Sequence, residues 1–489
     1  MWIIPLCLIS LVVIWITHWV HKWGNPKGKG RLPPGSMGFP IIGETIQFFA
    51  PHTKCDVPPF FNKRTARYGP LFRTSLVGQQ IVVSTDPEIN YYIFQQEGKY
   101  FQCYYTESFL KILGDQSLLQ YHGLFHKYLK NLILKLTGRE NLKETLLHEM
   151  DGHTSRSMHS WASHGNVDVK DGIAEMIFEY FAKKLFSYDD KEGLKKLRAN
   201  YKAFLNGLIS FPLNIPGTAY YACMQGRKNV VKVIKDAFKE RKQSQVPQHD
   251  FLDHLLEEVK KEGTFLTEEI AMDLVFVLLF ATYETTSTAV TFATKFLAEH
   301  PSALAELTQE HETILRSREN EESEMTWEEY KSMTFTHMVI NETVRLANIA
   351  PMILRRVTKD VELKGYIIPE GWLVMVSTLS THLDPDMHKD PLAFNPWRWE
   401  GQELHAGSKN FMAFGGGVRL CVGADFAKLQ TAIFLHHLVT KYSVENNRRR
   451  GHSSKIIFVI SKWIAHPNLT KKPHLKIEIA FERKRYIML

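Results

Sequence analysis

The sequence predicts a mainly α-helical protein, in which one large helical domain with small β-sheets follows an N-terminal transmembrane helix. The chain has 489 residues, 44% of them hydrophobic and 23% charged, which is the composition of a globular protein. No linker rich in Gly, Ser or Pro interrupts residues 60–440, so we expect one domain, although length alone would suggest about three. Two long apolar stretches, residues 2–20 and 267–300, would supply an anchor and a core helix.

The first element is the apolar segment at residues 2–20, which is followed by His21 and Lys22. About 20 apolar residues span a bilayer, and the Trp residues near both ends are typical of membrane–water interfaces. The positive charges follow the segment, which argues against a cleaved signal peptide and places the rest of the chain in the cytosol. We predict a transmembrane anchor at residues 1–21 and a basic, proline-rich hinge at residues 22–43.

A long helix is predicted at residues 267–300. Thr267 is a suitable N-cap, acidic residues fill the first turn, and Pro301 ends the pattern. A helix of about 50 Å that is so apolar has to cross the core of a large domain. Glu284 and Thr285 in its middle are costly to bury unless they are hydrogen-bonded. Hydroxyls that bond back to carbonyls of the preceding turn are the simplest interpretation.

Residues 326–329 (Thr, Trp, Glu, Glu) form a capping box and predict the start of another helix. Glu342 and Arg345 follow three residues apart, so they share one helix face. Taken alone they could form a surface ion pair worth less than about 1 kcal/mol. The apolar residues 424–438 predict a further helix near the C-terminus.

The most informative segment is a glycine-rich run with a single cysteine: Phe414, Gly415, Gly416, Gly417, Val418, Arg419, Leu420, Cys421, Val422 and Gly423. This layout suits a cysteine thiolate that ligates a haem iron, because glycines let the backbone pass close to a flat macrocycle. Arg419 could neutralise a haem propionate. The helix predicted at residues 424–438 would stabilise the thiolate of Cys421 through its amides and dipole. A buried free cysteine in a turn is the alternative.

The pattern Phe-x-x-Gly-x-Arg-x-Cys-x-Gly in this run resembles the haem-binding loop of the cytochrome P450 family. The resemblance implies haem b (iron protoporphyrin IX) with Cys421 as its metal ligand, and with Phe414, Gly415, Arg419 and Gly423 at the cofactor. It also implies a monooxygenase that receives electrons from NADPH through NADPH–cytochrome P450 reductase. Thiolate ligation favours O–O cleavage.

Residues 281–287 resemble the acid–alcohol segment of the same family. Glu284 and Thr285 would then be catalytic, because splitting O2 requires protons that this pair could relay through ordered water. The segment departs from the family pattern at Thr282, where Gly is usual. Relatives that rearrange oxygenated lipids without a reductase typically lack the acid–alcohol pair, so Thr285 argues against that activity.

Further residues match the family by position. Glu342, Arg345 and Arg398 would form a buried structural network. Arg355 would bind the haem propionates together with Arg419, and Arg356 is the alternative to Arg355 in this role.

Two positions depart from the family pattern of Trp-x-x-x-Arg. His126 and Lys130 stand there instead, and both could still donate to carboxylates or lie on a solvated helix face. Lys127, Lys130 and Lys428 could form a basic face for the reductase, or be ordinary solvated lysines.

Residues 395–399 and 411–417 look like the plant clan that oxidises sterols, triterpenoids and brassinosteroids. The resemblance implies a lipophilic sterol or triterpenoid substrate, and sterol side-chain cleavage toward pregnenolone and cardiac glycosides is one reaction of this kind. A triterpenoid or brassinosteroid ring hydroxylase is the alternative. The family-like monooxygenase domain spans residues 44–442, and residues 443–489 form an atypical tail that could leave an inactive haem-binding relative.

Composition excludes several other classes. Five scattered cysteines without a CxxC pair argue against zinc and disulfide frameworks. The net charge of +8 favours an anionic membrane or an acidic partner, and we expect no nucleic-acid binding because no basic run is interleaved with aromatics. Together with the anchor, these features predict a single-pass protein of the endoplasmic reticulum membrane with a cytosolic catalytic domain.

Overall fold

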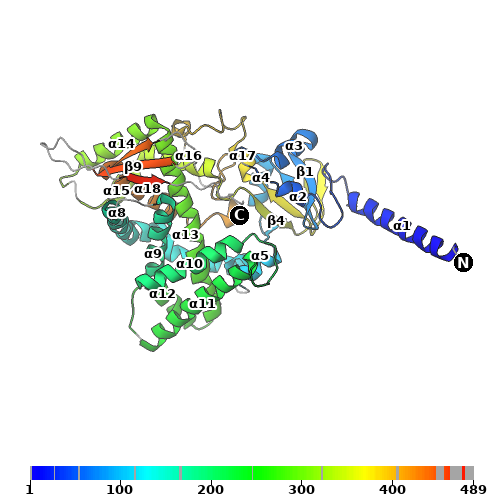
Figure 1. The fold of residues 1–489 in the computed structure, drawn as a ribbon, viewed down its shortest axis with the longest axis horizontal. Coiled ribbons are helices and arrows are strands. Elements are labelled where there is room, and N and C mark those ends of the chain that lie inside the picture. Colours follow the sequence, from blue (N-terminus) through cyan, green and yellow to red (C-terminus); the bar gives the residue numbers. More distant parts are fainter. Residues whose placement is uncertain are drawn as a thin grey trace.

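The computed structural model describes residues 3–26, 28–52, 56–114, 117–164, 168–244, 246–320, 323–402, 407–447, 456–462 and 476–479. Most helices gather in one large body, the main sheet lies beside it, and helix α1 projects beyond the sheet (Figure 1). The predicted mainly helical class with small sheets is confirmed.

The α-helices are α1 (Ile3–Gly24), α2 (Thr45–Phe48), α3 (Pro59–Tyr68), α4 (Pro87–Gln95), α5 (Glu107–Leu113), α6 (Gly123–Thr137), α7 (Arg139–Asn141), α8 (Leu147–His164), α9 (Val169–Phe186), α10 (Lys191–Gly207), α11 (Ala219–Ser244), α12 (Phe251–Val259), α13 (Glu268–Glu299), α14 (Pro301–Arg316), α15 (Trp327–Ser332), α16 (Thr334–Ala347), α17 (Thr378–His382) and α18 (Ala424–Lys441). Shorter helical turns are η1 (Leu118–Gln120), η2 (Leu142–Leu146), η3 (Pro396–Trp399) and η4 (Gly417–Arg419). The strands are β1 (Leu71–Leu76), β2 (Gln79–Ser84), β3 (Phe101–Cys103), β4 (Ile353–Val357), β5 (Val361–Leu363), β6 (Tyr366–Ile368), β7 (Leu373–Val376), β8 (Tyr442–Asn447), β9 (Ile456–Lys462) and β10 (Lys476–Ile479).

The main sheet has five strands in the order β1-β2-β7-β4-β3. Strands β2 and β7 are parallel, and the other pairs are antiparallel. This order brings the N-terminal third of the chain against the segment after α16. In particular, Cys103 of β3 pairs with Arg355 of β4, a register that no local sequence pattern reveals.

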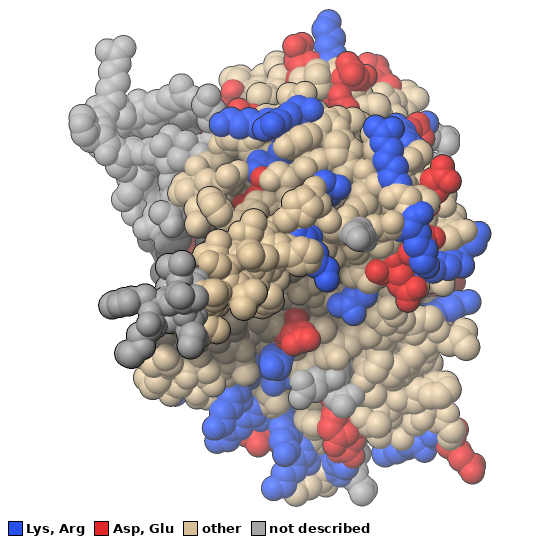
Figure 2. All heavy atoms as spheres, turned by 90° about the vertical axis from the view of Figure 1, so that its right-hand side faces the viewer, with Lys and Arg blue, Asp and Glu red and all other residues tan. Residues whose placement is uncertain are grey.

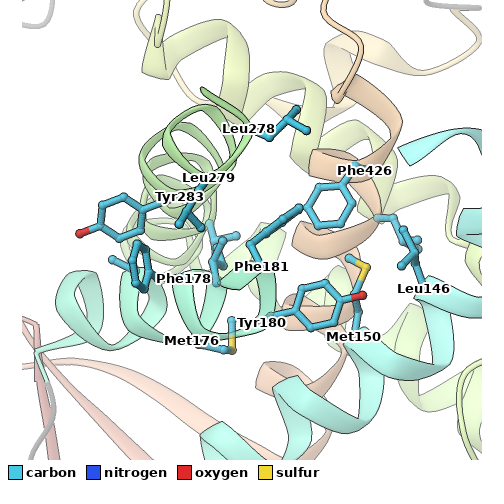
Figure 3. Close-up of a cluster of buried hydrophobic side chains, with 14 of the residues drawn as sticks. Leu146, Met150, Met176, Phe178, Tyr180, Phe181, Leu278, Leu279, Tyr283 and Phe426 are labelled. Atoms are coloured by element: carbon cyan, nitrogen blue, oxygen red, sulfur yellow. The ribbon is translucent and has the colours of Figure 1, made fainter. Parts of the chain in front are cut away.

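The core of the helical body is built around α13, which packs against α9, α16 and α18. Figure 3 shows aromatic and aliphatic side chains of α8, α9, α13 and α18 meeting in one cluster, among them Phe178, Phe181, Tyr283 and Phe426. The ring centroids of Phe181 and Phe426 lie 4.8 Å apart in an edge-to-face arrangement, which stabilises such a pair beyond the area it buries.

The prediction of a long core helix is confirmed. The Thr267 hydroxyl accepts a hydrogen bond from the Ile270 amide at 3.3 Å and caps α13. Among the described residues, α13 is the helix that is long and apolar enough to span a membrane, and 67% of its most apolar window is buried. That burial is typical of a core helix.

The N-terminal segment forms α1, a helix of 22 residues that ends at Gly24, shortly before Pro26. Its apolar side chains are exposed, for example Leu11 and Trp15. Figure 2 views the molecule from the side on which α1 projects, and neutral side chains occupy the middle of this face with Lys and Arg around them.

The C-terminal tail forms an antiparallel sheet in the order β10-β9-β8 where it is described. Strand β8 continues directly from α18, and β10 contacts α9. The remainder of the predicted tail, at 448–455, 463–475 and 480–489, lies outside the described residues.

Candidate active site

The glycine-rich run forms a closed loop just before α18. The Cys421 amide donates to the Phe414 carbonyl at 3.0 Å, and the Gly415 amide donates to the Met412 carbonyl at 2.9 Å. The Cys421 side chain retains accessible surface. Burial raises the pKa of its thiol, whereas a hydrogen bond from the Gly423 amide and the positive charge of Lys130 act in the opposite direction. The loop therefore presents one thiol with two groups that favour its thiolate.

The structure shows why glycines are required in this loop. Gly415 and Gly417 have φ values of 75° and 61°, a region that L-residues with a side chain rarely occupy. A Cβ at Gly416 would lie 2.7 Å from the Phe94 ring, and one at Gly417 would lie 2.0 Å from the Phe94 carbonyl oxygen. Close packing on α4 therefore adds a second reason for glycine, beside the close approach to a macrocycle that the sequence predicted.

Two predicted cations, Arg355 and Arg419, meet at one buried carboxylate that the sequence did not reveal. The Arg355 Nε lies 2.6 Å from the Glu97 Oε2, and the Arg419 Nε lies 3.6 Å from the Glu97 Oε1. Arg356, the alternative to Arg355, is exposed. Its guanidinium carbon lies over the Tyr104 ring, 4.6 Å from the ring centroid. The strand alternation of β4 thus directs Arg355, and not Arg356, toward the loop of Cys421.

Helix α6 brings the two predicted substitutes for the family's Trp and Arg to the same loop. The Lys130 ammonium donates to the carbonyls of Val418 and Leu420, both at 3.2 Å. Burial and the neighbouring charges of Arg419 and Lys130 lower the pKa of His126 to about 4, so this imidazole is neutral at pH 7. The side chain that contacts Arg419 is His122, whose Nδ1 lies 2.8 Å from Arg419 Nη2.

The middle of α13 passes beside the cysteine loop. Ala289 of α13 belongs to one buried cluster with Phe411, and Phe414 packs against that cluster. Ala281 is exposed and Thr285 half-buried, although the helix around them is mostly buried. The Thr285 hydroxyl donates to the Ala281 carbonyl at 2.6 Å, as the simplest sequence interpretation expected, and its oxygen can still accept a further hydrogen bond.

Comparisons with known proteins agree with this arrangement. The family model described as cytochrome P450 matches residues 33–462. The chain belongs to the cytochrome P450 family. The match includes residues 443–462, the first part of the predicted tail. Membership makes the chain a P450 monooxygenase, and the family implies a haem iron.

The relatives are plant P450s. The chain is 53% identical to cytochrome P450 87A3 of Oryza sativa subsp. japonica, over 90% of this chain and 86% of that protein. It is 43% identical to the cucurbitadienol 11-hydroxylase of Siraitia grosvenorii, over 90% and 94% of the two chains. It is 36% identical to the cholesterol 16,22-dihydroxylase CYP90G4 of Trigonella foenum-graecum, over 96% of each. Among solved structures, retinoic acid-bound cyanobacterial CYP120A1 matches with a TM-score of 0.77 and 25% identity, over 88% and 96% of the two chains.

The residues of this P450 fit a haem. Haem b carries two carboxylates and needs an axial donor. The chain supplies the Cys421 thiol and two guanidinium groups, Arg419 from the same loop and Arg355 from β4. One terminal nitrogen of each arginine has no hydrogen bond within the described residues. The site thus offers a thiol for the iron and cations for the carboxylates.

The predicted structural network of the P450 is centred on Glu342. Glu342 accepts from Arg345 at 2.7 and 2.9 Å, from Arg398 at 2.9 Å and from the Trp399 indole at 3.0 Å. Arg345 also donates to the backbone carbonyl of His382, the last residue of α17, and to those of Pro391 and Ala393 in the segment that follows. The structure therefore brings together the three residues that the sequence grouped.

His382 is a site residue that the sequence analysis missed. Its Nε2 accepts from the Met412 amide at 3.1 Å, and its Nδ1 lies 3.0 Å from the Asn348 Oδ1. Because Nε2 is the acceptor, Nδ1 carries the proton, and the ring links the end of α16 to the cysteine loop. Burial and the positive charge of Arg345 lower the pKa of His382 to about 3. Nothing in the run Thr378–His382 of α17 distinguishes this histidine from an ordinary one.

Proposed function

We propose that this P450 is a membrane-anchored monooxygenase that inserts one oxygen atom from O2 into a sterol or triterpenoid. The observation that supports this most directly is that the Arg355–Arg419 pair and the part of α13 around Ala289 meet the loop that carries Cys421. When bound, haem supplies activation of O2 and its transfer to a carbon–hydrogen bond. Cys421 would hold the haem iron, with the Gly423 amide favouring its thiolate.

The chain's own residues have distinct proposed roles around the cofactor. Arg355 and Arg419 would hold the two haem carboxylates, with Lys130 and the neutral imidazole of His126 at the edge of the same site. Phe414, Gly415 and Gly423 would lie against the macrocycle.

Glu284 and Thr285 are the proposed catalytic pair, which would relay through ordered water the protons that the splitting of O2 requires. We expect Thr285→Val to consume NADPH with far less product, because Val keeps the shape and loses the hydroxyl. Thr294→Val is the matched control, since Thr294 makes the same bond back to the Val290 carbonyl, at 2.9 Å, from a buried position farther along α13. If the two variants form the same amount of product for each NADPH consumed, Thr285 has no catalytic role.

The relatives support the proposed substrate class. They include a hydroxylase of cucurbitadienol and a dihydroxylase of cholesterol, so tetracyclic skeletons are the proposed substrates. Membrane microsomes that contain the chain and a plant reductase would be given cholesterol, cucurbitadienol and β-amyrin, with products analysed by mass spectrometry. A product heavier by one oxygen identifies hydroxylation, and loss of the side chain identifies cleavage toward pregnenolone. No conversion of any of them, by a protein with normal haem, would refute the proposed class.

We further propose α1 as the anchor in the endoplasmic reticulum membrane, with the catalytic domain cytosolic. Apolar side chains near α1 are strongly exposed, among them Phe39 and Ile46, each at 73%. Electrons would come from NADPH through the reductase. Of the three lysines suggested for its docking, Lys127 is exposed, whereas burial lowers the pKa of Lys130 and of Lys428.

The first test is the difference spectrum of reduced microsomes with and without carbon monoxide. A strongly red-shifted Soret band is expected for thiolate ligation, and Cys421→Ser should abolish it. The band of a neutral-ligand haem in the unaltered chain would contradict the role of Cys421.

A further inference from the structure

A carboxylate lies between the two arginines of the proposed haem site. Glu97 follows the C-terminus of α4, and its side chain is 6% exposed. The Glu97 Oε1 accepts a hydrogen bond from the Cys103 amide at 2.8 Å, which fixes the carboxylate on strand β3. Its two oxygens then face Arg355 at 2.6 Å and Arg419 at 3.6 Å.

Each of the two guanidinium groups contacts Glu97 through its Nε. One terminal nitrogen of each group contacts other residues of the protein. Arg355 Nη1 donates to the Leu354 carbonyl at 3.0 Å and contacts the Cys103 sulfur at 3.6 Å. Arg419 Nη2 donates to the Tyr121 carbonyl and lies 2.8 Å from His122 Nδ1. Within the part of the chain that the structure describes, the second terminal nitrogen of each arginine makes no hydrogen bond, so it can serve an added anion.

Two buried guanidinium groups repel each other unless an anion lies between them. Glu97 is that anion here, and it comes from a third element, after α4, while Arg355 comes from β4 and Arg419 from the cysteine loop. The geometry points to Glu97 as a positioning residue, which we propose holds both arginines in place to bind the two carboxylates of haem. The inference rests on the proposed function, because it assigns a partner to the same loop.

The charges agree with this assignment. Arg355, Arg419 and Lys130 carry three positive charges and Glu97 one negative charge, while His126 is neutral. The remaining two positive charges equal the two negative charges of the haem carboxylates. The thiolate of Cys421 would be balanced separately, by the single net positive charge of an iron(III) porphyrin core.

The test compares Glu97→Gln with Glu88→Gln in the full-length protein. Glu88 lies on α4, is 65% exposed and pairs with Lys409 at 2.7 Å, so its substitution is a matched loss of one surface carboxylate. We expect haem b to transfer to apomyoglobin about tenfold faster from the Glu97→Gln protein, since a buried charge pair is lost. We also expect a more positive reduction potential of its haem, because one negative charge near the iron is removed. A purely structural role would not shift the potential.

Equal haem loss and equal potential in both variants would overturn the inference. If Glu97→Gln does not fold, Glu97→Asp provides the test. The shorter side chain keeps the negative charge but reaches only one arginine. We therefore expect haem to be lost faster from Glu97→Asp than from the unaltered chain. Loss from Glu97→Asp at the unaltered rate would also overturn it. Failure of the proposed function would show separately, as a missing red-shifted band in the unaltered chain.

Discussion

Two buried arginine clusters lie near the cysteine loop, and they differ in how many of their polar atoms have hydrogen-bond partners in the protein. In the Glu342 cluster, Arg345 and Arg398 donate to a carboxylate and to backbone carbonyls, and Glu342 accepts five hydrogen bonds. In the Glu97 cluster, Arg355 pairs with Glu97 at 2.6 Å, but one terminal nitrogen of Arg355 and one of Arg419 have no hydrogen bond within the described residues.

The difference teaches how to distinguish a structural cluster from a binding cluster of the same residue types. A buried ion network whose donors and acceptors all find protein partners is complete, and removing one member leaves an uncompensated charge. A network with hydrogen-bonding capacity left over favours an anion from outside. The Glu342 cluster therefore supports the loop, and the Glu97 cluster is suited to the cofactor that the loop would bind.

The largest expected effect breaks the complete cluster. Glu342→Gln would leave Arg345, which is fully buried, without its counter-ion, at a cost of about 3–5 kcal/mol in the free energy of unfolding. Denaturant unfolding measures this, and much of the chain should fail to fold. Glu400→Gln, an exposed carboxylate on the segment that follows Trp399, is the control and should change stability by less than about 0.5 kcal/mol. Equal unfolding midpoints of the two variants would show that the cluster is not structural.

The pH dependence of stability tests the comparison further, because a histidine with a lowered pKa lies near each cluster. The folded pKa of His382, beside Arg345, is about 3, which is below its value of about 6.5 in an unfolded chain. Stability is therefore full above pH 6.5, and it should fall by about 1.4 kcal/mol per pH unit below pH 6.5 until the folded pKa is reached. His126, with a pKa of about 4, is partly exposed, so solvent screening makes its share smaller.

The measurement is the free energy of unfolding at pH 7, 6 and 5 for the unaltered chain, His382→Gln and His126→Gln. We expect His382→Gln to flatten the pH dependence by nearly one proton and His126→Gln to flatten it less. The reverse order would contradict the assigned burial of the two rings.

Arg355→Met tests the incomplete cluster. The loss of one cation should speed haem loss about tenfold, as expected for a charged hydrogen bond of roughly 1.5 kcal/mol, with a smaller effect on unfolding than Glu342→Gln. Arg356→Met is the matched control, because it is the next residue and exposed. If haem is lost faster from Arg356→Met than from Arg355→Met, then Arg356 and not Arg355 binds the haem carboxylate.

The sequence could predict what depends on local pattern. The caps of α13 and α15, the helix after Cys421 and the grouping of Glu342 with Arg345 follow from spacing alone. Glu97 and His382 could not be predicted, because their roles depend on contacts between segments far apart in the chain. The pairing of β3 with β4 places Glu97 beside Arg355, and nothing near Glu97 in the sequence indicates burial.

The smallest expected effect concerns the outer face of α6, away from both clusters. Lys127 is exposed, whereas Lys130, three residues later, donates to the carbonyls of the cysteine loop. Lys127→Ala should therefore weaken reductase binding by less than about 1 kcal/mol, as for an exposed ion pair, and the difference should vanish at high salt, where charges are screened. Lys63→Ala, an exposed lysine on α3, is the control. The effect is measured by titrating the microsomal activity with reductase at two salt concentrations. If the loss of reductase affinity does not depend on salt, Lys127 contributes a contact and not a charge.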